Sequence, residues 1–503
     1  MSSHHHPAGS PGTLLALLQG ADQATAIIEP RSGDATSYGQ LREAIEHIAR
    51  QLVAEGVEPG DAVAIVGPND PAFLVSFLAV VALGASAAPL NPTYTEAEFR
   101  SYLQDLQAKR VLVRDGAGEH ARAASGALGI GVLGLVGDRA TEAALDGVDP
   151  AAERTDGDPD SVALLLHTSG TTSKPKGVPL RQRNLHASAR SVAAGYRLTS
   201  EDVSHCVMPL FHVHGLVASV LATFATGGTV LVPPRFSASV FWDDAAAHGM
   251  TWFSAVPTIH QILVRDGAER PADVPLRFAR SCSSALAPTT WRACEDAYGV
   301  PVTEAYGMTE ASHQMTTNPL PPEERRPGSV GVATGIEVGV VDERWMQLGA
   351  GTSGEVVVRG PSVVDGYRAN PQANAEAFRD GWFRTGDLGA LSEEGYLTLH
   401  GRIKELINRG GEKISPHEIE DALLSHPAVA EAVAFPEPDP KYGERVGVAA
   451  VLVGEGSTED LVAHCAERLA AFKVPARIVL VDTIPKGPTG KVQRRRLADQ
   501  LSP

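Results

Sequence analysis

Short hydrophobic runs alternate with helical patterns through the first four-fifths of the chain. The apolar run 62–66 predicts a buried strand, and residues 71–83 predict an apolar helix directly after it. A helix over 96–106 and a strand over 110–114 repeat the same order. Because parallel strands need a crossover connection, this alternation predicts a parallel sheet with helices on its faces.

The predicted strands become shorter later in the chain. Further strands are predicted at 161–166, 229–232 and 252–255. From 338 to 359 apolar and polar residues alternate over short distances, which is typical of a small β-barrel or an antiparallel sheet.

A domain boundary is predicted near residues 401–404. The segment beyond it has about 100 residues, close to the usual size of a domain. Helices are expected there over 416–425 and 458–469, and strands over 429–435 and 446–453. The predicted fold class is therefore α/β, with a large N-terminal domain (residues 1–402) of layered parallel αβ sheets and a small β-barrel-like subdomain, followed by a small α+β C-terminal domain (403–503).

Composition and charge narrow the possible partners. A chain of 503 residues, 43% of them hydrophobic, is too long for one ordinary core. A formal net charge of −17 argues against nucleic acid or an anionic membrane as the main partner, and no run of about 18 apolar residues predicts a membrane span. The four cysteines lack metal-ligand spacing, so we expect reduced thiols in a cytoplasmic protein. The oligomeric state stays open between monomer and homodimer.

The segment 168–177 carries the strongest chemical signal. It reads Thr-Ser-Gly-Thr-Thr-Ser-Lys-Pro-Lys-Gly and follows a predicted buried strand. Hydroxyls and glycine amides at a strand end can wrap a polyphosphate, and lysines add positive charge. The order Gly-Lys-Ser/Thr of a P-loop is absent. The candidate phosphate-binding residues are Thr168, Ser169, Gly170, Thr171, Thr172 and Lys176.

This segment resembles the signature loop of the adenylate-forming superfamily of acyl-CoA synthetases, peptide-synthetase adenylation domains and beetle luciferases. Further motifs follow in the family's order, from 37–41 to Lys491, so the resemblance covers nearly the whole chain. It implies that a carboxylate attacks ATP to give acyl-AMP and pyrophosphate, after which a thiol displaces AMP. It also implies a mobile C-terminal domain that rotates about Lys404 between the two half-reactions.

The resemblance assigns a nucleotide site. In the segment 306–310, Tyr306 and Gly307 would lie by the adenine, Thr309 would contact the α-phosphate, and Glu310 would hold Mg²⁺. A hard cation takes oxygen ligands, and ATP brings phosphate oxygens as the others.

The segment 281–288 departs from the family. Where the family has Gly-Gly-Ala or Gly-Ser-Ala against the adenine, this chain has Ser283, Ser284 and Ala285 after a cysteine. The residues stay small, and the added hydroxyls are placed to reach the acid.

The remaining family motifs lie toward the C-terminus. Asp387 and Arg402 are expected at the ribose hydroxyls, Gly410 and Gly411 beside the pantetheine arm of coenzyme A, and Lys491 is the expected adenylation lysine. An ammonium group that contacts both the acid and the α-phosphate would stabilise the charge that develops during attack. We expect the arginine run 494–496 to be a solvated helix face.

Histidines and hydroxyls mark the expected acid site. The segment 209–215 matches the family's acyl-site wall, with His212 at the usual gate position, and 255–261 matches a further wall. These groups suit a small, polar, dianionic acid better than a fatty chain. The chain is closest to the oxalate-CoA ligase branch, which implies oxalate as the acid. The pocket candidates are His212, His214, Ser283, Ser284 and His313, and each histidine has the alternative of a structural role.

Several alternatives remain open from the sequence. The expected co-substrates are ATP with Mg²⁺, a small carboxylic acid and coenzyme A, which the apparent lack of a fused carrier domain favours as acceptor. An aryl or medium-chain acid, or an amine or nitrite acceptor, would fit the same fold. A catalytically silent nucleotide-binding protein is a different class, and the presence of Lys491, Glu310, Asp387 and Arg402 argues against it.

Overall fold

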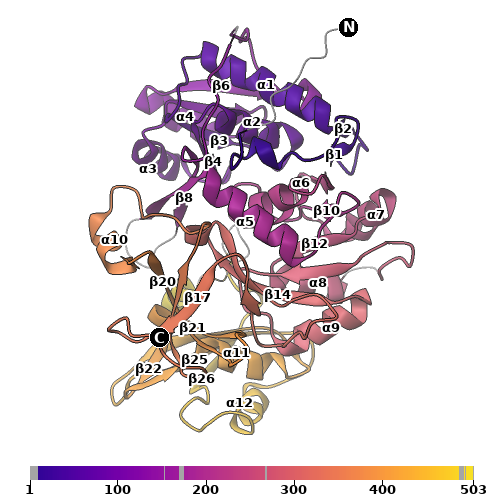
Figure 1. Ribbon diagram of the computed structural model, residues 1–503. Coiled ribbons are helices and arrows are strands. Elements are labelled where there is room, and N and C mark those ends of the chain that lie inside the picture. The colour runs from indigo at the N-terminus through magenta and orange to yellow at the C-terminus, as the bar shows by residue number, and fades with distance from the viewer. Residues whose placement is uncertain are drawn as a thin grey trace.

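A computed structural model describes residues 10–151, 153–168, 175–266, 269–486, 492 and 494–501 of the protein. The strands of this part of the chain form four sheets. Figure 1 shows the chain passing broadly from the N-terminal sheet at the top to the C-terminal sheet at the bottom. No helix among the described residues is long and apolar enough to cross a membrane.

The first sheet has seven strands in the order β7-β6-β5-β3-β4-β8-β9. The strands are β3 (Ala62–Val66), β4 (Ser86–Leu90), β5 (Arg110–Arg114), β6 (Gly131–Val136), β7 (Ala144–Leu145), β8 (Val162–Thr168) and β9 (Lys176–Arg181). All pairs are parallel except those of the edge strands β7 and β9. This confirms the predicted parallel sheet.

Helices cover both faces of this sheet. They are α1 (Tyr38–Ala54), α2 (Pro71–Ala82), α3 (Glu96–Leu106) and α4 (Glu119–Leu128). Val63 and Ile65 pack into the core that α1 and α2 share, whereas Ala64 and Val66 pack with α3 and α4. Because successive strand residues point to opposite faces, β3 is buried on both sides, as its unbroken apolar run predicts.

The second sheet has nine strands in the order β16-β15-β14-β13-β12-β10-β11-β1-β2. The strands are β1 (Thr25–Ile28), β2 (Ala35–Ser37), β10 (Val203–His205), β11 (Thr229–Leu231), β12 (Trp252–Ala255), β13 (Phe278–Ser281), β14 (Val302–Met308), β15 (His313–Thr317) and β16 (Val332–Ala333). The six strands from β1 to β14 in the middle of this order are parallel, and β2, β15 and β16 add antiparallel pairs.

Five further helices and a π-helix accompany this sheet. They are α5 (Gln182–Gly195), α6 (Ala222–Phe224), α7 (Ala238–His248), α8 (Pro257–Asp266), α9 (Pro288–Tyr298) and the π-helix His214–Leu221. In Figure 1, α5 runs between the first sheet and the second. Aromatic side chains of α7, α9 and β12, among them Trp242, Phe253 and Trp291, form a separate core.

The third sheet is antiparallel and has five strands. They are β17 (Glu337–Val341), β18 (Gly354–Arg359), β19 (Phe378–Arg379), β20 (Trp382–Leu391) and β21 (Leu397–Arg402), with α10 (Pro371–Ala377) beside them. The prediction of short antiparallel strands from residue 338 is confirmed. The 3₁₀ helices are Leu15–Leu17, Ala140–Glu142, Thr309–Ala311 and Ile403–Glu405.

The fourth sheet contains the C-terminal strands. They are β22 (Ile407–Arg409), β23 (Glu412–Ile414), β24 (Val429–Asp439), β25 (Gly443–Leu452) and β26 (Arg477–Leu480), with helices α11 (Pro416–Leu424), α12 (Thr458–Ala466) and α13 (Arg494–Leu501). Among the described residues these strands pair only with one another, and their core includes Ile407, Ile414 and Leu423. A separate C-terminal domain that starts at residue 403 remains a prediction.

The expectation of a solvated arginine run is wrong for Arg494. Its guanidinium is almost buried and forms ion pairs with Glu420 of α11 and with Glu405, at 3.4 Å from the latter. His417 contacts the same carboxylate at 3.1 Å. Burial alone would raise the pKa of Glu420, but the charge of Arg494 and the contact with His417 lower it to about 2. An arginine in a short helix at the chain end thus holds α11 and α13 together.

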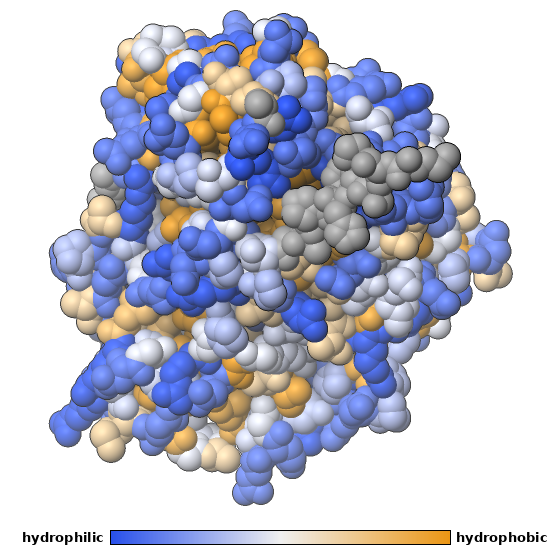
Figure 2. Space-filling view, turned by 45° about the horizontal axis from the view of Figure 1, so that its top comes forward, coloured by the Kyte–Doolittle hydropathy of each residue, from blue (hydrophilic) through white to orange (hydrophobic). Residues whose placement is uncertain are grey.

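The face of the molecule in Figure 2 is mainly hydrophilic. On the face in Figure 2, apolar side chains are scattered among polar ones and do not gather into one large patch. Such scattering is normal for a folded protein and gives no reason to place a docking surface there.

Candidate active site

The phosphate-loop prediction falls at the junction of β8 and β9. Thr168 and Lys176 pair with each other across the two strands. Ser169, Gly170, Thr171 and Thr172 lie outside the described residues. The two ends of the predicted loop are therefore held together at the carboxyl end of a buried strand.

Tyr367 joins the phosphate-loop lysine to the predicted metal ligand. The Nζ of Lys176 lies 4.4 Å from the centre of the Tyr367 ring, and the Tyr367 hydroxyl donates to Oε1 of Glu310 at 2.9 Å. The backbone amide of Val364 also donates to the carbonyl oxygen of Glu310. The sequence did not identify Tyr367, because a lone tyrosine in a loop carries no signal of its own.

Glu310 fits the role of a magnesium ligand. It lies in a 3₁₀ turn after β14, is buried, and keeps a second carboxylate oxygen beyond the one that Tyr367 contacts. No group of three or more His, Cys, Asp or Glu side chains within the described ranges is placed to hold a metal. A magnesium ion at Glu310 would therefore take most of its oxygen ligands from a bound polyphosphate.

We predict that Tyr367→Phe weakens the response to Mg²⁺ and leaves the fold intact. Losing one hydrogen bond to a charged group should raise the Mg²⁺ concentration for half-maximal activity about 5- to 10-fold. Pyrophosphate release measured across a Mg²⁺ titration tests this. Tyr396→Phe is the control, since its hydroxyl donates to the Glu324 carbonyl on the surface, and an equal effect in both variants would contradict the prediction.

The predicted ribose residues meet at one point. Asp387 and Arg402 are direct partners across β20 and β21, and Nε of Arg402 lies 2.9 Å from Oδ1 of Asp387. The Tyr306 hydroxyl donates a short hydrogen bond to the other oxygen, Oδ2. Burial, and then the Asp387 charge, raise the pKa of Tyr306, so its phenol stays protonated. The exposed Lys404 follows in the next 3₁₀ turn, where the hinge is predicted.

Tight backbone packing shapes the nucleotide segment. A Cβ on Gly307 would lie 1.9 Å from the carbonyl oxygen of His313, so no other residue fits there without opening the β14–β15 pair. Thr309 is half-buried in the turn before Glu310. Ser284 and Ala285 are exposed after β13, as a segment that lies against a ligand requires.

Buried Glu304 fixes the backbone of the segment that follows β13. Its carboxylate accepts from the backbone amide of Leu286 at 2.9 Å, and the side chain is buried. Burial raises the pKa of Glu304 to about 8, and the charge of Asp421 adds to the effect. The folded protein therefore keeps this carboxyl protonated at neutral pH.

We predict that Glu304→Gln stabilises the protein in a pH-dependent way. Since the folded pKa lies above the unfolded one, the carboxyl costs stability progressively as pH rises from about 4.5 to about 8. A neutral amide that still accepts from Leu286 removes that cost, so the Tm should rise by about 2–4 °C at pH 8 and stay unchanged at pH 4.5. Thermal unfolding at both pH values measures it, with the exposed Glu393→Gln as control; an equal shift at both values would contradict the cause.

The predicted acid-site residues surround a buried arginine. Nδ1 of His214 lies 3.0 Å from Oγ of Ser283, and the rings of His214 and His313 stack with centroids 5.1 Å apart. Arg280 of β13 is fully buried and donates to Nε2 of His313 at 2.9 Å. His212 is half-buried, and its Nδ1 accepts from the backbone amide of His214 at 3.2 Å. Of the five predicted pocket residues, four thus form one contact group, with Ser284 next in the chain.

The wall segment 255–261 contributes a structural histidine. His260 is fully buried between the Tyr298 hydroxyl and the Arg280 carbonyl oxygen, at 3.2 and 3.1 Å. Burial lowers the pKa of His260 to about 4. For this histidine the structural alternative is the correct one.

The predicted coenzyme A glycines have no part in these contacts. Gly410 and Gly411 form the exposed turn between β22 and β23, both with positive φ, at 59° and 98°. Lys491 lies outside the described residues.

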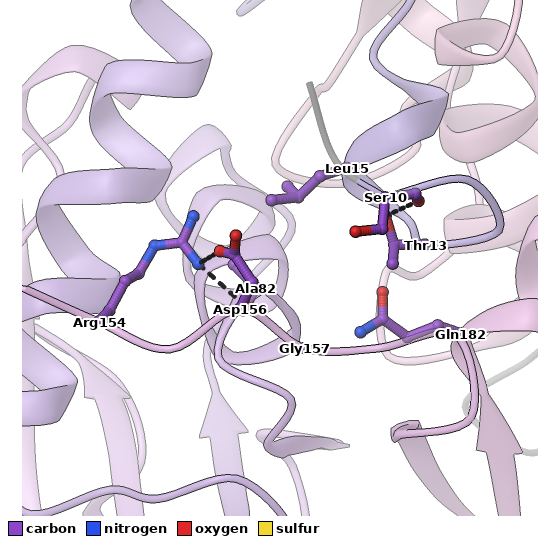
Figure 3. A pocket seen from close by; sticks show the side chains of 8 residues that line it. All are labelled: Ser10, Thr13, Leu15, Ala82, Arg154, Asp156, Gly157 and Gln182. Carbon is purple, nitrogen blue, oxygen red and sulfur yellow. Dashed lines mark hydrogen bonds and ion pairs between the residues drawn. The ribbon is translucent and has the colours of Figure 1, made fainter. Parts of the chain in front are cut away.

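Two cavities lie away from these side chains. A groove of about 350 Å³ separates α8 and α9 from the C-terminal sheet, where Lys486 and Glu431 pair at 2.7 Å. A second, smaller pocket has a volume of about 10 Å³. Figure 3 shows that Arg154 reaches Asp156 and the carbonyl of Ala82 there. The smaller pocket has room for a single water molecule, so it is not a ligand site. The contacts of Arg154 in it hold the segment before β8 in place.

Comparison with known proteins decides the family. The AMP-binding enzyme model matches residues 18–368, and the model of the AMP-binding enzyme C-terminal domain matches 418–491. The chain belongs to the AMP-binding enzyme family. The fold of parallel sheets and the grouping of Tyr306, Asp387 and Arg402 agree with this membership.

Relatives of this AMP-binding enzyme are CoA ligases. A probable CoA ligase of Humulus lupulus is 48% identical, with 92% of this chain and 91% of the relative covered. The oxalate–CoA ligases of Arabidopsis thaliana and Saccharomyces cerevisiae are 47% and 42% identical, covering 92% and 95% of this chain and 93% and 94% of the relatives. Among solved structures, ATP-bound MatB from Rhodopseudomonas palustris has a TM-score of 0.88 and 31% identity over 97% of this chain and 98% of that one.

Proposed function

We propose that this AMP-binding enzyme is an ATP-dependent ligase that joins oxalate to coenzyme A. The supporting observation is the grouping of His214, Ser283 and His313 around buried Arg280. His313 comes three residues after the candidate metal ligand Glu310. An acid site built from a positive charge and hydrogen-bond donors suits a small dianion. Relatives that cover almost the whole chain are oxalate–CoA ligases.

In the first half-reaction, a carboxylate oxygen of the acid attacks the α-phosphorus of ATP, and the bond to pyrophosphate breaks. Asp387 and Arg402 would hold the ribose hydroxyls, and Tyr306 would lie at the adenine. Lys176 would contact the polyphosphate and Thr309 the α-phosphate, with Thr168 and the adjoining loop around them. Magnesium, when bound, neutralises phosphate charge, and Glu310 would hold it.

Lys491 would bring the attacking carboxylate and the α-phosphate together in this step. In the second half-reaction, the sulfur of coenzyme A attacks the acyl carbon, the bond to AMP breaks, and the thiol proton is released. We propose that residues 403–503 rotate about Lys404 between the two steps, which would bring Gly410 and Gly411 to the pantetheine arm.

We also propose that the enzyme works in the cytoplasm. All four cysteines are buried and unlinked, which fits a compartment that keeps thiols reduced.

A pyrophosphate-release screen tests the proposed function. The acids are oxalate, malonate, sulfoacetate, benzoate and octanoate, each with and without coenzyme A. We include sulfoacetate because a Cupriavidus necator relative, 40% identical, is a sulfoacetate–CoA ligase. We expect oxalate to give the highest kcat/KM, with AMP release that depends on coenzyme A.

The outcomes separate the alternatives. Equal or faster turnover of octanoate or benzoate would overturn the assignment of the acid. If oxalate stimulates pyrophosphate release but coenzyme A does not change AMP release, the assignment of coenzyme A as the acceptor would be overturned. No turnover with any acid would favour a silent homologue, whereas turnover that Lys491→Ala removes would exclude it.

A further inference from the structure

Arg280 carries a buried charge that no neighbouring anion balances. The side chain is fully buried at the carboxyl end of β13, and it forms no ion pair with any residue in the described ranges. A guanidinium cannot lose its proton under ordinary conditions, so burying it is costly unless it is paired. The buried, unbalanced charge of Arg280 therefore creates a permanent positive electrostatic potential beside the acid site.

All its donors are used on neutral acceptors. Nε donates to the Tyr196 hydroxyl at 2.8 Å, Nη1 to Oγ of Ser254 at 2.7 Å, and Nη2 to Oε1 of Gln314 at 3.0 Å. Two further contacts are to Nε2 of His313 at 2.9 Å and Nε2 of His214 at 3.5 Å. The hydrogen-bonding groups of Arg280 are therefore satisfied, but its positive charge is not balanced. Arg280 needs no further hydrogen-bond partner, and its charge favours an anion nearby.

The contacts also fix where the histidine protons lie. Because a guanidinium only donates, Nε2 of His313 must accept, and the proton of its neutral ring is on Nδ1. Ser254 accepts from Arg280 and lies 2.7 Å from Nε2 of His214. If Nε2 of His214 carried a proton, that N–H would face the N–H of Arg280 Nη1. The Ser254 hydroxyl therefore donates to Nε2 of His214, and the proton of the His214 ring lies on Nδ1 as well.

This arrangement ends at Ser283. Nδ1–H of His214 donates to Oγ of Ser283 at 3.0 Å, so the proton of the Ser283 hydroxyl is directed elsewhere. The backbone around it is unusual, since Ser283, Ser312 and His313 all have positive φ, at 76°, 55° and 110°. Such conformations in non-glycine residues are costly and cluster at functional sites.

We propose that Arg280 is a positioning and specificity-determining residue, which holds His214 and His313 as Nδ1–H donors and makes the site select an acid with a second negative charge. The proposal rests on the proposed function, because it concerns the second carboxylate of the acid. Arg280 acts from behind the layer of His214, Ser283 and His313 and does not touch the acid.

The first experiment compares oxalate with oxamate, in which an amide replaces one carboxylate at the same size. In the unaltered protein kcat/KM for oxalate should exceed that for oxamate. In Arg280→Gln this ratio should fall about 30- to 300-fold through KM for oxalate, while the KM for ATP stays within about 3-fold. Arg280→Lys keeps the charge but has too few donors for the five acceptors, so it should recover only part of the ratio.

The control is Arg154→Gln, which removes another nearly buried arginine outside the acid site. Arg154 is ion-paired with Glu46 at 2.6 Å and lies beside Asp156 in Figure 3. The control substitution should leave the ratio unchanged even if it lowers the Tm. Equal losses for oxalate and oxamate in Arg280→Gln would overturn the proposal, and so would full recovery in Arg280→Lys. If the unaltered protein shows no preference for oxalate in the acid screen, the proposed function itself fails, and the two failures are thereby distinguished.

A second measurement needs no change at Arg280. Long-range ¹H–¹⁵N spectra of protein labelled in the histidine rings report which nitrogen carries the proton, and His214→Gln and His313→Gln assign the signals. We expect Nδ1–H in both rings. A proton on Nε2 of His313 would overturn the proposal.

Discussion

Glu310→Gln is expected to lower kcat for acid-dependent pyrophosphate release by about 100- to 1000-fold, the size of effect seen when one group that stabilises developing charge is removed. The amide keeps an oxygen that can accept from the Tyr367 hydroxyl, so the local geometry is preserved and only the charge is lost. The reduced negative charge should also raise the Mg²⁺ concentration needed for activity, because an amide oxygen is a weaker ligand for a hard cation.

Single-turnover assays with varied Mg²⁺ measure both effects. The matched control is Glu337→Gln, an exposed glutamate that pairs with Arg359 at 2.7 Å on the third sheet. If Glu310→Gln has an unchanged kcat at saturating Mg²⁺, Glu310 does not take part in the adenylation step.

Glu420→Gln is expected to destabilise the C-terminal segment by about 3–5 kcal/mol, because breaking a buried ion pair leaves Arg494 without its closest carboxylate. The loss should appear in one part of the molecule. All five tryptophans precede residue 403, so tryptophan fluorescence follows the first three sheets, whereas circular dichroism follows the whole chain. In urea, we expect circular dichroism to gain an early transition that the fluorescence lacks.

Glu418→Gln is the control on the same helix. Its carboxylate pairs with Lys473 at 2.6 Å, but Glu418 is exposed to solvent and Lys473 is only half-buried, so the loss of this pair should cost less than about 1 kcal/mol. Equal effects of the two substitutions would contradict the role of burial. The pair should also respond to acid: since the Glu420 pKa is lowered to about 2, its contribution is complete above about pH 4.5 and is lost as pH falls through 2.

The local pattern predicted the elements well. The predicted bounds of α3, β5 and β12 coincide with those of the structure, because each segment has a strong period and clear end signals such as the Thr95 capping box. The β24 and β25 strands are longer than predicted at the ends where they meet, since their pairing continues past the apolar residues to Asp439 and Gly443. Periodicity marks the buried part of a strand and not its hydrogen-bonded length.

The site was predictable only where motifs exist. Asp387, Arg402 and Tyr306 were named from motifs, and the structure brings them together. Tyr367 and Arg280 were missed, because their importance comes from neighbours far away in the sequence. Arg494 was misread for the same reason, since a helical arginine run gives no sign that Glu420 lies opposite.

The contacts of Tyr367 also bear on how the enzyme is made in the cell. Lys176 comes from the first sheet, Glu310 from the second, and Tyr367 from the segment before α10, and the Asp387–Arg402 pair forms later still. On the ribosome, most of the chain must be synthesised before these groups can meet. A ligand stabilises only the form that binds it, so ATP should not protect the growing chain and should shield only the finished protein from proteases.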